Sequence, residues 1–265
     1  MKPKSKILII AGSDSSGGAG IQADIKTVTA LGSYAMTAIT AVTAQNTKGV
    51  KKIISIPTEI VKKQITMILD DIGTHAVKIG MLHNTDIIKS VYKTLKKYKS
   101  KNVVLDPVMI AKGGAKLISN SSIKHLKKLL LPLCTIVTPN IPEAEVLTGY
   151  SISSKEDMIK AAKKILSMGP KNVLLKGGHL KNKMIFDILA TKKGIKIFKK
   201  RKIKTKNTHG TGCTLASAVA TGLAQEMSLE SAVERARQYV LGAIKNAPGF
   251  GSGHGPLNHS HNFSS

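Results

Sequence analysis

The segment from residue 6 to residue 24 reads KILIIAGSDSSGGAGIQAD. Its short apolar run 7–11 predicts a buried strand, and the residues from Gly20 onward follow a helical pattern. Glycines in the intervening loop let the backbone approach a ligand, and the N-terminus of a helix attracts anions. The loop is neither a dinucleotide fingerprint nor a phosphate loop that ends in Gly-Lys-Ser/Thr. By itself it fits a flexible turn as well as a ligand site, but the segment predicts a strand–loop–helix unit of a layered α/β fold.

The alternation of short β-branched runs and longer helical patterns continues along the chain. We predict strands at residues 6–11, 34–44, 75–79, 102–106, 134–138 and 172–176. Helices are predicted at residues 20–31, 58–71, 85–98, 121–130, 155–168, 211–224 and 229–247. Residues 184–204 alternate with a shorter period, which predicts an antiparallel meander at a sheet edge. We expect a mostly parallel sheet in a single domain, residues 1–265, with a surface tail from about residue 249.

The composition describes a globular protein with a large positive charge. The chain has 265 residues, 42% hydrophobic and 21% charged, and a formal net charge of +26. The basic residues are almost all Lys, with Arg only at positions 201, 235 and 237. Proteins that read nucleic acids depend on Arg for bidentate contacts and on aromatic residues for stacking. The Lys residues here are spread over predicted helix faces without aromatic neighbours, so we expect no nucleic-acid partner.

Two cysteines are too few for a disulfide framework. Cys134 lies in the apolar run 133–137 and is expected in the core. The apolar run 7–11 leads directly into the glycine loop, so we interpret it as a strand and not as a signal peptide. No stretch is long enough to span a membrane. We therefore expect a cytoplasmic protein with no membrane partner.

Acidic side chains follow two of the predicted strands. Asp106 leaves the strand 102–106, where a carboxylate can hold magnesium through water, although an ordinary turn aspartate is the commoner case. Further along, Asn140 precedes Pro142 and Glu143 at the start of a helix. Acids in a first helical turn usually complement the helix dipole. This second loop alone therefore favours a structural role.

The segment 207–214 reads NTHGTGCT and opens a helix of small residues. Its alternating glycines expose consecutive N–H groups at a helix N-terminus, an arrangement that stabilises charge on a transferring phosphoryl group. Cys213 lies in the first turn, where the helix dipole lowers the pKa of a thiol. His209 either binds phosphate or caps the loop, and the sequence leaves both roles open.

These loops, taken in order, resemble the ribokinase-fold family and, within it, the bacterial hydroxymethylpyrimidine/phosphomethylpyrimidine kinases. The matching segments extend from about residue 6 to the Gly-His-Gly-Pro of residues 253–256. They are residues 11–24, 44–47 (AQNT), 78–82 (KIGML), 106–109 (DPVM), 138–140 (TPN), 175–179 (LKGGH) and 207–214. The combination of Gly-Thr-Gly-Cys with the segment around Gln45 is the most specific part of the pattern.

The resemblance implies a ribokinase-like three-layer α/β/α sandwich with its active site at the carboxyl ends of the strands. It also implies ATP as phosphoryl donor, Mg²⁺ as the ion and a homodimer. The implied substrate is 4-amino-5-hydroxymethyl-2-methylpyrimidine and then its monophosphate, which are thiamin precursors.

The resemblance assigns expected roles to named residues. Gln45 has the donors and acceptor to bind an aminopyrimidine; the other expected substrate contacts are Gly12, Asp24, Met81 and Val108. The catalytic set is Cys213, as a base or as a group that only orients the hydroxyl, with the anion hole of Gly210, Thr211 and Gly212 and with Lys176. The expected nucleotide contacts are Asn140, Lys176 and Thr208. Magnesium is expected near Asp106 and Glu143.

Of three other interpretations, the sequence leaves the first open and weighs against the other two, because Arg and aromatic residues do not cluster and the catalytic motifs are intact. A pyridoxal kinase, or a kinase that accepts both pyridoxal and the pyrimidine, would have the same fold. A basic nucleic-acid-binding protein would not require Cys213. A kinase fold retained only for interactions would not require the intact Asp106, Lys176 and Gly-Thr-Gly-Cys segment.

Overall fold

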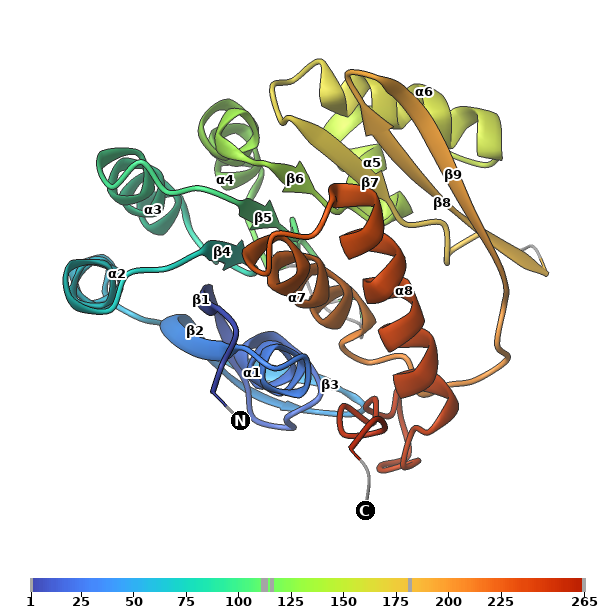
Figure 1. Cartoon of the computed structure of the whole chain (residues 1–265), viewed down its shortest axis with the longest axis horizontal. Helices are drawn as coiled ribbons and strands as arrows, with labels where there is room; N and C mark the ends of the chain where they lie inside the picture. Colours follow the sequence, from blue (N-terminus) through green and yellow to red (C-terminus); the bar gives the residue numbers. More distant parts are fainter. Residues whose placement is uncertain (1, 111–113, 115–116, 181–182, 264–265) are drawn as a thin grey trace.

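Strand β1 (Lys6–Asp14) lies inside the sheet and pairs in parallel with β2 (Tyr34–Asn46) on one side and β4 (Ala76–Ile79) on the other. The computed structural model describes residues 2–110, 114, 117–180 and 183–263, so the last two residues of the predicted tail lie outside it. Within these residues nine strands form one sheet in the order β3-β2-β1-β4-β5-β6-β7-β8-β9 (Figure 1). The remaining strands are β3 (Gly49–Ser55), β5 (Val103–Leu105), β6 (Ile136–Val137), β7 (Asn172–Leu175), β8 (Met184–Thr191) and β9 (Gly194–Arg201).

The centre of the sheet is parallel and its edges are antiparallel. Strands β2, β1, β4, β5, β6 and β7 run in the same direction, whereas β3 pairs antiparallel with β2. At the other edge β7, β8 and β9 form an antiparallel meander. The mostly parallel sheet and the predicted meander are therefore confirmed.

Alternating residues of β1 face two separate cores. Ile7 and Ile9 are fully buried in the core shared with α1 (Gly20–Ala30), α7 (Thr211–Ala224) and α8 (Leu229–Lys245). Leu8 and Ile10 are equally buried in the core on the opposite face. The helices of that face are α2 (Thr58–Asp71), α3 (Thr85–Lys97), α4 (Asn120–His125), α5 (Ile141–Thr148) and α6 (Lys155–Leu166). A parallel strand covered on both faces requires such a continuous apolar run, and the three-layer sandwich is confirmed.

Three elements differ from the sequence prediction. Strand β3 was not predicted, because Lys51 and Lys52 are exposed and hide its alternation. The start of helix α5 near Pro142 was expected, but its range was not among the predicted helices. The helix predicted at residues 121–130 is shorter: α4 ends at His125, and a π-helical turn (Leu126–Leu130) and a 3₁₀ turn (Leu131–Leu133) follow. Pro132 in that last turn has no N–H to continue an α-helix.

The C-terminal segment is exposed at residues 249–252, as expected of a surface tail, but further along it packs against the rest of the molecule. Leu257 and His259 are buried, and the Tyr239 hydroxyl on α8 donates to the His259 carbonyl at 2.6 Å. Pro256 forms a parallel bridge with His209, while Phe250 and Phe263 remain exposed. The segment therefore meets the loop before α7 at residues 255–256 and then packs beside α8, where the Asn258 N–H donates to the Ala243 carbonyl. It lies near the C-terminal end of α8 (Figure 1). Within the described ranges, no helix has the length and apolar character needed to cross a membrane.

Candidate active site

The pocket lies where the parallel strands end and encloses a cavity of about 690 Å³. This is the usual position of a ligand site in an open α/β sheet, and the volume suits a small organic ligand. Five adjacent strands supply residues to it: Gly12 lies near the end of β1, Met81 follows β4, Asp106 follows β5, Asn140 follows β6 and Lys176 follows β7. The N-terminus of α7 closes the floor between them.

One end of the pocket holds most of the predicted substrate contacts. Gln45, Gly12, Met81 and Val108 all line it. A side chain at position 12 would meet the Met81 methyl group, so any larger residue there would force the Met81 side chain to shift. The apolar Met81 and Val108 together with the carboxamide of Gln45 can hold a flat polar heterocycle.

Asp24 is not in this lining, which corrects its predicted role as a direct substrate contact. Its side chain is fully buried on α1 and lies 2.6 Å from Lys78 Nζ. Ser217, one turn after Cys213 on α7, donates to Asp24 Oδ1 at 2.7 Å. Although burial lowers it, the Asp24 carboxylate raises the pKa of Lys78. Burial also raises the pKa of Asp24, and Lys78 and Ser217 oppose this effect. Asp24 therefore joins α1, β4 and α7 beneath the pocket, and a buried ion is left uncompensated if either partner is removed.

The glycine loop and the α7 loop meet at Asp14 and His209. His209 Nε2 lies 2.7 Å from Asp14 Oδ2 and 3.3 Å from Gln45 Nε2. Asp14 also accepts hydrogen bonds from the Ser16 N–H and hydroxyl and from the Ala19 N–H. Although burial alone would raise it, His209 and the two bonds from Ser16 lower the pKa of Asp14 to about 2. The role of His209, left open by the sequence, is therefore to connect the two loops beside Gln45.

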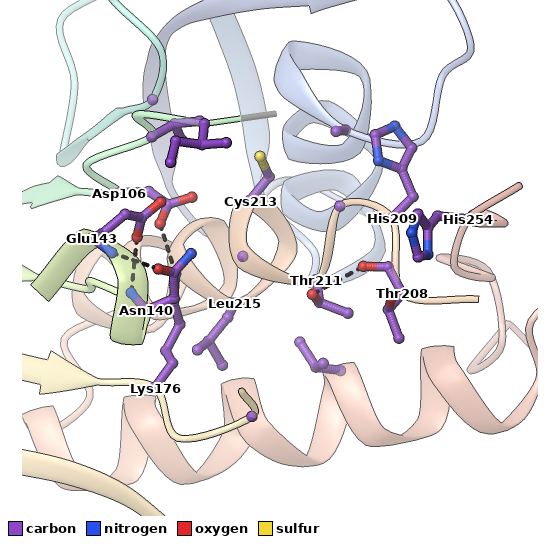
Figure 2. Close-up of a pocket in the computed structure, with 18 of the residues that line it drawn as sticks. Asp106, Asn140, Glu143, Lys176, Thr208, His209, Thr211, Cys213, Leu215 and His254 are labelled. Carbon is purple, nitrogen blue, oxygen red and sulfur yellow. Dashed lines mark hydrogen bonds and ion pairs between the residues drawn. The ribbon is translucent and has the colours of Figure 1, made fainter. Parts of the chain in front are cut away.

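The N-terminus of α7 presents the predicted anion hole to the pocket. Gly210, Thr211, Gly212 and Cys213 all line the cavity. Gly210 has φ +82°, a left-handed conformation, and packs against the Gly18 carbonyl with no space for a side chain. Thr211 donates its hydroxyl to the Thr208 carbonyl at 3.1 Å. Figure 2 shows Cys213 between the His209 side of the pocket and the Asp106 side.

The pKa of Cys213 does not follow the sequence expectation. Burial raises the pKa of this thiol to about 12, even though the nearby Lys78 ammonium acts in the opposite direction. The expected lowering by the helix dipole is outweighed because the thiol lies in a poorly solvated pocket. The side chain is thus a protonated thiol at neutral pH in the ligand-free protein.

Asp106, Lys176, Asn140 and Glu143 form a polar group on the opposite side of Cys213 (Figure 2). Lys176 Nζ lies 2.8 Å from Asp106 Oδ1. Asn140 and Glu143 form a reciprocal capping box at the start of α5, with bonds of 2.8 and 2.9 Å. Burial raises the pKa of Glu143 to about 8; Lys176 opposes this effect and the Asp106 carboxylate adds to it. Glu143 therefore has a structural role at the start of α5, which its loop alone favoured, and it also lines the pocket.

Magnesium fits this group of oxygen donors. Asp106 and Glu143 are both buried, and the pKa of Glu143 is raised. A bound cation would stabilise the ionised form of both carboxyl groups. Among the described residues no cluster of three His, Cys, Asp or Glu side chains could enclose a metal alone. Mg²⁺ usually keeps several waters and binds through one or two carboxylates together with substrate phosphates, so such a cage is not required.

Sequence reasoning missed an apolar wall and one residue of the C-terminal segment. Val240, Leu241 and Ile244 of α8 line the pocket together with Ile203, which follows β9. The spacing of the three α8 residues matches one helix face, but it equally fits core packing. His254 also lines the pocket, and its N–H donates to the Thr47 carbonyl at 2.8 Å. The Gly-His-Gly-Pro segment was recognised, but its position in the fold was not.

Comparison with known sequences places the same family over nearly the whole chain. Residues 14–258 match the family model described as phosphomethylpyrimidine kinase. A thiamine biosynthesis bifunctional protein of Geobacter sulfurreducens is 50% identical over 97% of this chain, and the chain spans about half of that protein (52%). A hydroxymethylpyrimidine/phosphomethylpyrimidine kinase of Bacillus subtilis is 48% identical, with 96% of this chain and 94% of the relative covered.

Solved structures agree with the fold. An ADP complex of Bacillus subtilis pyridoxal kinase matches with a TM-score of 0.90 and 38% identity, covering 97% of this chain and 98% of that one. A phosphomethylpyrimidine kinase of Clostridium difficile matches with a TM-score of 0.81 and 46% identity, covering 91% and 99%. The pyrimidine kinase has the higher sequence identity and the pyridoxal kinase the higher structural score.

Proposed function

The chain belongs to the phosphomethylpyrimidine kinase family and is a kinase of thiamine biosynthesis, and from this premise we propose how its pocket works. The reaction transfers the γ-phosphoryl group of ATP to 4-amino-5-hydroxymethyl-2-methylpyrimidine and then to its monophosphate. The observation that carries the proposal is that one cavity joins the Gln45 recess to the anion hole before α7. A hydroxymethyl group bound beside Gln45 therefore faces the N–H groups that stabilise a transferring phosphoryl group.

At the substrate end, the ring packs between Met81 and Val108 while Gln45 binds its amino group and ring nitrogen. Gly12 allows the ring to lie close to the backbone. Cys213 directs the hydroxyl toward the phosphoryl group and remains a thiol before the reaction. This agrees with phosphoryl transfer through a loose transition state, in which positioning and charge stabilisation do most of the work.

At the donor end, the backbone of Gly210, Thr211 and Gly212 accepts the charge that develops on the phosphoryl oxygens. Lys176 contacts the phosphates, and Asn140 and Thr208 lie on either side of them. Asp106 and Glu143 would hold Mg²⁺ through water, and the ion when bound supplies positive charge to the phosphates. The wall of Val240, Leu241 and Ile244 provides an apolar surface for the adenine ring.

A pyridoxal kinase activity is the second candidate, because a pyridoxal kinase is among the structures with a TM-score of 0.90. Both substrates carry a hydroxymethyl group on a six-membered heterocycle. The sequence comparisons favour the pyrimidine, since the curated relatives at 42–48% identity are named for it.

The test is an ATP–magnesium kinase assay with the hydroxymethylpyrimidine, its monophosphate and pyridoxal in parallel. We expect turnover of both pyrimidines and much slower turnover of pyridoxal. A preference for pyridoxal would contradict the substrate assignment but would leave the proposed anion hole unaffected. Replacing Gln45 by Ala should raise the KM for the pyrimidine far more than the KM for ATP; equal effects would remove Gln45 from the substrate site.

We also propose that the chain acts as a homodimer in the cytoplasm without a nucleic-acid partner. The resemblance to the family supports the dimer, and sedimentation of the purified protein tests it. The dispersed, Lys-rich charge supports the absence of specific nucleic-acid binding.

A further inference from the structure

The hydrogen bonds around Gln45 determine which end of its carboxamide faces each neighbour. One end of the carboxamide lies 3.3 Å from His209 Nε2, and the other lies 3.2 Å from Thr43 Oγ1. A half-turn about the Cγ–Cδ bond exchanges the nitrogen and the oxygen without moving the rest of the side chain. The positions of the protons on His209 and Thr43 therefore determine which of the two carboxamide orientations is favoured.

Asp14 fixes the proton on His209. The ionised carboxylate of Asp14 can only accept hydrogen bonds, and its Oδ2 lies 2.7 Å from His209 Nε2. Nε2 must therefore carry a proton, whether the imidazole is neutral or charged. A carboxamide nitrogen of Gln45 on this side would place two donors against each other. A carboxamide oxygen would instead share the N–H as a second acceptor.

Thr43 requires the same orientation. Its hydroxyl has one proton, and the Ser13 carbonyl lies 2.9 Å away, closer than the carboxamide of Gln45 at 3.2 Å. Once that proton is donated to Ser13, Thr43 Oγ1 presents only lone pairs. It then accepts an N–H from the carboxamide. Both neighbours thus favour oxygen toward His209 and nitrogen toward Thr43.

We propose that the buried Asp14–His209 pair holds Gln45 in this orientation and thereby makes His209 a positioning residue for substrate specificity. This inference rests on the proposed function, in which Gln45 binds the ring. The pyrimidine carries an amino group, a donor, on the carbon next to its hydroxymethyl carbon. Pyridoxal carries an aldehyde, an acceptor, at the corresponding carbon. A fixed carboxamide oxygen accepts from the amino group and repels the aldehyde.

The fixed orientation also directs the reacting group. With the oxygen of Gln45 on the His209 side, the ring binds with its amino group on that side as well. The neighbouring hydroxymethyl group then points toward Gly210–Cys213, because His209 directly precedes these residues. A carboxamide free to turn would accept either substrate and would also accept the ring in the reverse orientation.

The experiment compares the wild type with His209→Phe, which fills a similar volume without a donor, and with His209→Gln, which keeps an N–H for Asp14. The readout is the ratio of kcat/KM for the pyrimidine to kcat/KM for pyridoxal, with an inhibition constant for pyridoxal where turnover is absent. We expect His209→Phe to lower this ratio about tenfold or more, and His209→Gln to retain most of it. An equal loss for both substrates in His209→Phe would overturn the proposal.

A second measurement does not depend on activity. In ¹⁵N-histidine NMR spectra of the full chain, the His209 signal is identified by its loss in His209→Phe. We expect a proton on Nε2, and an unprotonated Nε2 would overturn the proposal. The variant Gln45→Ala distinguishes failure of the proposed function from failure of the role of His209. An unchanged KM for the pyrimidine would show that Gln45 does not bind the substrate. A raised KM in Gln45→Ala, together with an unchanged kcat/KM ratio of the two substrates in His209→Phe, would contradict only the role of His209.

Discussion

Two opposite effects act on the pKa of the Cys213 thiol. The N-terminus of α7 stabilises a thiolate, whereas the poorly solvated pocket stabilises the neutral thiol. Burial is the larger effect and raises the pKa of Cys213 to about 12. We therefore interpret Cys213 as a group that orients the substrate hydroxyl and not as a preformed base.

The rate of alkylation by iodoacetamide tests this interpretation. Because only the thiolate reacts, the rate for Cys213 should rise about tenfold per pH unit and should not level off near pH 9. Cys134, fully buried in the core, is the internal control and should not react in the folded protein. A plateau below about pH 8 would show a stabilised thiolate.

The turnover of the variant Cys213→Ser tests the same interpretation kinetically. If the side chain only orients the hydroxyl, turnover should fall about tenfold, since loss of a general base usually costs about a hundredfold or more. A larger loss with intact ATP binding would restore the role of base.

At the residue scale, the sequence was most informative for side chains that follow a strand. Asp106, Lys176 and Gln45 reach one pocket because the topology brings strand ends together, and their motifs were recognisable. The Asp24–Lys78 and Asp14–His209 pairs join residues 54 and 195 positions apart. Such contacts depend on how α1 and α7 pack, which residue patterns do not specify.

Elements with a strong apolar pattern were predicted well, and those without one were not. Helix α7 occupies the predicted residues because its small side chains are buried nearly all round. Strand β3 is an edge strand with two exposed lysines, and the C-terminal segment is rich in polar residues, so their own sequences lack a clear period. Their positions are determined by tertiary contacts.

The C-terminal segment should loosen in mild acid, because it contains a buried neutral histidine. His259 Nε2 lies 2.9 Å from the Thr214 hydroxyl, and burial lowers the pKa of His259 to about 4. Between pH 6.5 and 4 the unfolded chain binds more protons at this residue, so the free energy of unfolding falls as the pH is lowered. The expected loss from this residue is up to about 3 kcal/mol.

Urea unfolding from pH 7 to pH 4 measures this effect, with His259→Gln as the matched variant. Glu143, with its pKa raised to about 8, acts in the opposite direction between pH 4.5 and 8, and its contribution is common to both proteins. We expect the variant to be less stable at pH 7 but to depend less on pH. The same pH dependence in both proteins would exclude His259 as the source.

The net charge of +26 acts on the molecule as a whole. Forty-one basic residues face fifteen acidic ones, so most Lys side chains repel one another without a partner. Added salt screens this repulsion more in the compact folded state than in the expanded chain. We expect the Tm at pH 7 to rise by several degrees between about 10 mM and about 500 mM NaCl.

A variant in which the exposed Lys51, Lys63, Lys89 and Lys160 are replaced by Glu is the control for this measurement. These side chains lie outside the pocket lining. The variant should show a smaller rise in Tm with salt. An equal rise would show that the salt acts through something other than charge repulsion.

The contacts of the C-terminal segment also affect folding during synthesis on the ribosome. Pro256 pairs with His209, which lines the pocket, and His254 lines the pocket itself while its N–H donates to the Thr47 carbonyl, so the pocket includes residues made last among those described. A nascent chain can fold its sheet as the strands emerge, but it cannot close this pocket until residues 254–259 have left the exit tunnel. Translation that stops before these residues leaves the pocket without the contacts of His254 and Pro256.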